Sequence, residues 1–94
     1  MHVRFTGTGR AQLLAALSFV RNENPAAAKV LLRRFTRRLR NLRRFPYSGK
    51  RLPNLRRGAY RELVIHPYRV FYRVQRPTIW VVAVWHSAQE PRRQ

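Results

Sequence analysis

Residues 60–86 form three consecutive segments rich in β-branched and aromatic residues, and two prolines separate them. Pro67 lies between the first and second segments, and Pro77 lies between the second and third. Because proline cannot donate a hydrogen bond to a central ladder, each proline marks a connection between strands. Residues 79–85 are apolar on both faces, as is typical of a central strand. The sequence therefore predicts three consecutive antiparallel strands.

Two amphipathic helices are predicted before these strands. The first covers residues 10–22, where apolar residues recur at steps of three and four, and Thr8 is its expected N-cap. Asn24 and Pro25 suit the N-cap and the first position of a second helix, which extends to about residue 44. The apolar face of this second helix comprises Ala28, Leu31, Leu32, Phe35, Leu39 and Leu42. A minimal connection between two such helices predicts an antiparallel hairpin with a shared buried seam.

The order of elements predicts an α+β fold with two layers. Residues 1–5 alternate and predict a short strand, and residues 45–57 contain prolines and a glycine and predict a structured loop. The order is then strand, helix, helix, strand, strand, strand. We expect the helical hairpin to pack on one face of an antiparallel sheet, while the other face carries arginine and aromatic residues. A single domain spans residues 1–94, with residues 87–94 as a loose polar tail.

The charge of the chain is strongly positive. Lys and Arg total 21 against three acidic residues, which gives a formal net charge of +18. Such a charge favours a polyanionic partner, which can be a nucleic acid, a ribosome or an acidic protein segment. Six arginines are candidates for contacting such a partner: Arg33, Arg37, Arg40, Arg44, Arg61 and Arg73. A solvated helix face is the ordinary interpretation of the first four, which lie opposite the apolar face of the second helix.

The residue types exclude several functional classes. The chain has no cysteine, and it has no apolar stretch near the roughly 20 residues that span a bilayer. We therefore expect a cytoplasmic protein without a membrane partner. Its three histidines, His2, His66 and His86, lack the spacing of metal ligands, and no glycine-rich phosphate loop is present. No metal or cofactor is predicted.

Five short motifs carry a family resemblance: ENPAAA at residues 23–28, LRRFPYSGK at 42–50, REL at 61–63, YRVFYRV at 68–74 and VWH at 84–86. Together they resemble the motifs of the RelE/ParE superfamily of bacterial toxins, and their residue patterns are closer to those of the ParE branch. The resemblance implies the toxin of a type II toxin–antitoxin pair. It also implies neutralisation by a cognate acidic antitoxin that is partly disordered when free.

The two branches of this superfamily imply different targets. A ParE-like toxin inhibits DNA gyrase and has no nuclease chemistry of its own, whereas a RelE-like toxin cleaves mRNA on the ribosome. ParE-type sequences often continue after the final histidine with an H-x-x-R pattern, but here His86 is followed by Ser87, Ala88 and Gln89. A third interpretation, which rests on charge alone, is a general RNA-binding module.

Cleavage of RNA by its own 2′-hydroxyl would need a base, an acid and a fixed cation beside the phosphate. Under the nuclease alternative, His86 is the candidate acid or base and Arg69 is the candidate cation. Arg73 and Glu62 are weaker candidates, and Glu62 is also expected to form an ion pair with Arg61 or Arg73. The segment after the last strand offers only Arg92 and Arg93 as further cations. The sequence therefore favours a binding protein over an enzyme.

Overall fold

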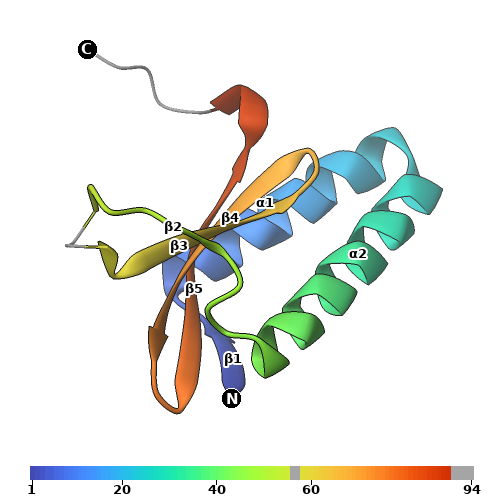
Figure 1. Cartoon of the computed structure of the whole chain (residues 1–94). Coiled ribbons are helices and arrows are strands. Elements are labelled where there is room, and N and C mark those ends of the chain that lie inside the picture. Colours follow the sequence, from blue (N-terminus) through green and yellow to red (C-terminus); the bar gives the residue numbers. More distant parts are fainter. Residues whose placement is uncertain (56–57, 90–94) are drawn as a thin grey trace.

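The computed structural model describes residues 1–55 and 58–89 and shows two helices packed on a five-stranded sheet (Figure 1). The helices are α1 (Gly7–Glu23) and α2 (Pro25–Arg44). The strands are β1 (His2–Phe5), β2 (Lys50–Arg51), β3 (Tyr60–Ile65), β4 (Tyr68–Gln75) and β5 (Thr78–His86). This arrangement confirms the predicted two-layer α+β fold, and the predicted order lacks only the two-residue strand β2.

The helical hairpin is confirmed, with one correction at its first cap. Asn24 alone connects α1 to α2, and its side chain accepts a hydrogen bond from the Ala27 N–H at 3.1 Å, as predicted. Helix α1 begins three residues earlier than predicted, because Thr6 is its N-cap and accepts from the Gly9 N–H at 3.1 Å. The prediction of Thr8 as the cap is therefore wrong.

The sheet is mixed, with the strand order β1-β5-β4-β3-β2. Strands β2 to β5 pair antiparallel, whereas β1 pairs parallel with β5. The prediction of a wholly antiparallel sheet is wrong for β1. A parallel pair needs a long crossover connection, and the chain from α1 to β4 supplies it. Strand β5 has a neighbour on each side, which confirms its predicted central position.

The core lies between the sheet and the two helices. Phe35 of α2 contacts Tyr68 of β4 with ring centroids 6.0 Å apart, and Gln12 of α1 accepts a hydrogen bond from the backbone N–H of Val84 in β5 at 2.8 Å. The apolar face of α2 is buried at Ala28, Leu31, Phe35 and Leu42. It is half-buried at Leu39, and Leu32 is 49% exposed, so Leu32 lies outside the buried part of the predicted apolar face.

The loop after α2 closes one end of this core. The Tyr72 hydroxyl donates to the Pro46 carbonyl at 2.9 Å and accepts from the Gly49 N–H at 2.9 Å. Arg61 donates to the carbonyls of Tyr47 and Gly49. The predicted structured loop over residues 45–57 is thus observed over residues 45–55, with β2 inside it. Residues 56 and 57 lie outside the described residues.

The first three residues of the predicted loose tail have a regular backbone conformation. Residues Ser87–Gln89 form a short 3-10 helix, and residues 90–94 lie outside the described residues. Among the described helices, none is both long and apolar enough to cross a bilayer.

Candidate interaction surfaces

Arg69 and His86 point to opposite faces of the sheet. His86 pairs with Tyr68, and their rings are 5.2 Å apart on the face that the helices cover. Arg69 is the next residue along β4, so its side chain points away from the helices. There its guanidinium lies 5.1 Å from the Phe71 ring centre. The structure therefore does not bring these two sequence-predicted site residues together.

Glu62 is the carboxylate that Arg69 holds. Arg69 donates from Nε to Glu62 Oε2 at 2.6 Å and from Nη2 to Oε1 at 2.9 Å. These hydrogen bonds lower the pKa of Glu62; burial opposes the shift, and the charges of Arg69 and Lys50 add to it. The prediction that Arg61 or Arg73 pairs with Glu62 is wrong. Arg61 projects to the other face of β3 and Arg73 donates to the Gln75 side chain at 3.1 Å.

His86 borders an apolar hollow of about 720 Å³ between α1 and the end of β5. Its Nδ1 accepts a hydrogen bond from the Ala88 N–H at 2.9 Å. Phe19 of α1, which is 66% exposed, lies at the same hollow. The Nδ1 contact and the ring contact with Tyr68 hold the imidazole ring at this end of the sheet.

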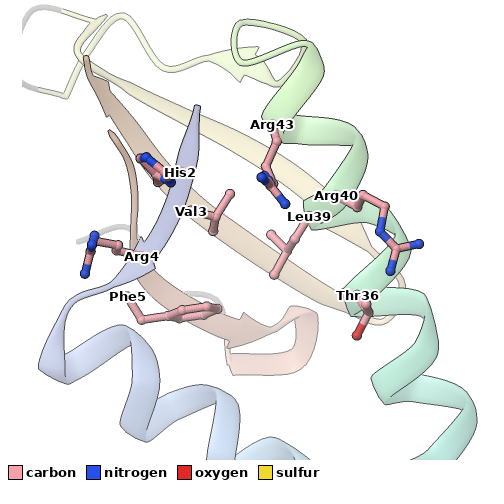
Figure 2. Close-up of a pocket in the computed structure, with 8 residues that line it drawn as sticks. All are labelled: His2, Val3, Arg4, Phe5, Thr36, Leu39, Arg40 and Arg43. Carbon is pink, nitrogen blue, oxygen red and sulfur yellow. The ribbon is translucent and has the colours of Figure 1, made fainter. Parts of the chain in front are cut away.

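A second hollow of about 540 Å³ lies between β1 and the C-terminal half of α2 (Figure 2). We call it the β1–α2 groove. Figure 2 shows Val3 and Phe5 of β1 pointing toward Leu39 of α2, which gives the groove an apolar floor. Arg40 and Arg43 of α2 supply its basic rim, and Arg43 donates to the Met1 carbonyl at 3.2 Å.

The outer edge of β1 adjoins this groove. Strand β1 is the last strand of the sheet on this side, so the described sheet leaves one edge of its backbone unpaired. An unpaired strand edge is a template for an added strand from another chain. The β1–α2 groove thus combines a backbone edge, an apolar floor and positive charge.

The six arginines proposed for polyanion binding do not form one surface. Four are exposed along α2: Arg33, Arg37, Arg40 and Arg44. Arg61 is tied into the loop after α2, where its guanidinium also lies 5.3 Å from the Tyr47 ring centre. Arg73 points to the face of the sheet that the helices leave uncovered. Only the α2 set is therefore continuous with the β1–α2 groove, through Arg40.

Sequence reasoning missed several residues of these surfaces. Val3, Phe5 and Arg43 line the groove, and none of them was a candidate site residue. The alternation of Val3 and Phe5 indicated one apolar face of β1. It did not indicate that this face meets α2, because the parallel pairing of β1 with β5 was not predicted. Within the described residues, no group of three acidic, histidine or cysteine side chains could hold a metal ion.

Comparisons with known proteins agree with this fold. A family model described as the ParE toxin of the type II toxin–antitoxin system parDE matches residues 3–91. A solved structure, the chromosomal ParDE toxin–antitoxin system from P. aeruginosa, matches with a TM-score of 0.74. The match has 18% sequence identity and covers 92% of this chain and 95% of that chain. Sequence comparison with curated proteins finds no match.

Proposed function

This chain belongs to the ParE toxin family of type II toxin–antitoxin systems, and we propose on that premise that it inhibits DNA gyrase and that a cognate acidic antitoxin neutralises it. The family match extends over residues 3–91, so it includes both helices and all of the sheet except His2. We place this activity in the cytoplasm, where gyrase acts on DNA.

The separation of Arg69 and His86 is the observation that favours binding over RNA cleavage. A proton-transfer group and a stabilising cation must reach the same phosphate to act together. Here the two side chains lie on opposite faces of the sheet. The Arg69 guanidinium also makes a two-point contact with Glu62, which offsets its charge. This geometry supports a toxin that acts by binding its target.

The β1–α2 groove is the surface that we assign to the antitoxin. Apolar side chains of an antitoxin segment would pack on Val3, Phe5 and Leu39, and its carboxylates would pair with Arg40 and Arg43. An acidic segment that is disordered when free can fold along such a groove and remove much of the self-repulsion of a +18 chain.

The choice of target can be tested by two parallel incubations of the purified toxin. One contains gyrase and supercoiled plasmid, and the other contains translating ribosomes with a labelled mRNA. We expect the toxin to trap gyrase on cleaved plasmid and to leave the mRNA intact. Ribosome-dependent cleavage of the mRNA without trapping of gyrase would contradict the proposal and favour the nuclease alternative.

The antitoxin site can be tested by charge reversal on α2. The double variant Arg40→Glu with Arg43→Glu should lose co-purification with the acidic antitoxin and remain toxic when both are expressed. The matched control is Arg33→Glu with Arg37→Glu, which removes the same charge from exposed positions outside the groove. Equal loss of antitoxin binding in both double variants would show that general charge, and not the groove, holds the antitoxin.

A further inference from the structure

A row of alternating cationic and aromatic residues crosses four neighbouring strands of the sheet. Arg4 of β1 pairs with Trp80 of β5, Trp80 pairs with Arg73 of β4, and Arg73 pairs with Tyr60 of β3. We call these four residues the cross-strand row. Since neighbouring strands are about 4.8 Å apart, the row is roughly 14 Å long.

The cross-strand row lies on the face that the helices leave uncovered. Ile79 and Val81, on either side of Trp80, are fully buried in the core, so Trp80 points the other way. Figure 2 shows Arg4 pointing away from α2, opposite to Val3 and Phe5. Arg4 is exposed, and the other three members of the row are partly exposed. Their side chains are therefore accessible from one side of the molecule.

The charge of this face suits an anionic ligand. Glu62 is the only acidic residue in the five strands, and it is held by Arg69. Glu62 lies diagonally from Arg73 on this face, but its carboxylate pairs with Arg69, and Arg73 donates to the Gln75 side chain instead. Arginine binds phosphate strongly because its planar group offers several donors in a fixed geometry.

We propose that the uncovered face of the sheet binds single-stranded nucleic acid through the cross-strand row. Bases stack on Trp80 and Tyr60, and the intervening phosphates contact Arg4 and Arg73. Stacking on aromatic side chains tolerates any base, so the site reads no sequence. The assignment goes beyond gyrase inhibition and antitoxin binding, because it uses the face opposite the helices; of its four residues, only Arg4 also borders the β1–α2 groove.

The aromatic members distinguish a single strand from other polyanions. A duplex keeps the faces of its bases stacked inside the helix, so it cannot use Trp80 and Tyr60 as platforms. An acidic peptide would pair with Arg4 and Arg73 but would leave the aromatic rings without a role. Single-stranded DNA and RNA share the required chemistry, and separate arms of the test compare them.

Tryptophan fluorescence gives a direct readout of this site. The chain contains only two tryptophans, Trp80 and Trp85. Trp85 contacts Phe71 on the same face, with ring centroids 5.0 Å apart. In a Trp85→Phe background, the remaining signal comes from Trp80 alone. Titration with oligothymidylate or oligouridylate should quench this signal to saturation, whereas a duplex of equal length and polyglutamate should leave it nearly unchanged.

Two substitutions test the two kinds of contact in the full-length chain. Trp80→Phe should weaken oligothymidylate binding about tenfold, because a smaller ring stacks less well. Arg4→Ala with Arg73→Ala should lower the steepness of the salt dependence of binding by about 1.4 on a log–log plot, since each phosphate contact contributes about 0.7. Binding by these variants is followed by fluorescence anisotropy of labelled oligonucleotide, and circular dichroism checks that they fold.

The matched control is Arg10→Ala with Arg21→Ala, which removes two exposed arginines from α1. It should change the affinity for oligothymidylate less than twofold. The proposal is overturned if this control weakens binding as much as Arg4→Ala with Arg73→Ala does. It is also overturned if polyglutamate or duplex quenches Trp80 as strongly as the single strands, or if Trp80→Phe folds and binds like the parent chain.

Discussion

His86 lies on the helix-covered face of the sheet, whereas Arg69 lies on the uncovered face. The cause is one extra residue in strand β5, between the β4–β5 turn and His86. Tyr72 pairs with Val81, but its neighbour Phe71 pairs with Ala83, so Val82 has no partner in the register. Side chains alternate along a strand, and the extra residue reverses which face every later residue of β5 occupies.

This reversal leads to the first prediction. If His86 does not act on RNA, then His86→Ala should change gyrase trapping only as far as it changes the folded fraction. Thermal unfolding measured beside the plasmid assay separates the two effects, because the variant loses the ring contact with Tyr68 and the hydrogen bond from Ala88. Ribosome-dependent cleavage that disappears in His86→Ala at an unchanged melting temperature would contradict this prediction.

The ion pair of Glu62 and Arg69 predicts how stability depends on acid. The pKa of Glu62 is lowered in the folded chain, so folding is favoured by its ionised form. This contribution is fully present above the ordinary value of 4.5 and is lost as the pH falls through the lower folded value. Urea unfolding between neutral and acidic pH should show this loss.

Glu62→Gln is the control for the acid prediction. Glutamine cannot titrate, so the variant should be less stable than the parent near neutral pH and should show a smaller decrease in its free energy of unfolding on acidification. Parallel curves for the two proteins would mean that the contact with Arg69 does not contribute to stability.

The parts of the fold that sequence predicted are those that depend on local patterns. Three such patterns each involve only a few neighbouring residues: the spacing of apolar residues in α2, the cap at Asn24, and the prolines at 67 and 77. These features predicted both helices and the three-stranded block. Thr6 and Thr8 are both acceptable caps by type, and Thr6 is the N-cap in the structure. It also hydrogen-bonds to the carbonyl of Val81 on a distant strand.

The surfaces were harder to predict because they depend on register. Simple alternation from the turn at Pro77 would place His86 on the same face as Arg69, and the extra residue at Val82 removes that proximity. The cross-strand row likewise requires β1 to lie beside β5, which no local pattern of residues 1–5 indicates. Arginine and aromatic residues were expected on the uncovered face, but their alignment across four strands was not.

Helix α2 predicts a graded response to truncation. Leu42 is 1% exposed, so Leu42→Ala should lower the free energy of unfolding by about 2–5 kcal/mol through lost burial and a residual cavity. Leu39 is half-buried at the groove, so Leu39→Ala should cost less stability and should weaken antitoxin binding. Arg37→Ala should change stability by less than about 0.5 kcal/mol. Equal effects of Leu39→Ala and Arg37→Ala in urea unfolding would mean that Leu39 does not pack on the core.

The buried hydroxyl of Tyr72 should contribute measurably to the free energy of unfolding, because it bonds two backbone groups of the loop after α2. Tyr72→Phe keeps the ring but removes the atom that donates to the Pro46 carbonyl and accepts from the Gly49 N–H. Leaving these groups without that partner should cost about 1–3 kcal/mol in urea unfolding. Gly49→Ala should also destabilise the loop, because the new Cβ would lie 2.5 Å from the same hydroxyl. Tyr47 is 53% exposed, so Tyr47→Phe is the control and should change stability by less than about 0.5 kcal/mol. Equal stability of Tyr72→Phe and Tyr47→Phe would show that the hydroxyl does not hold the loop.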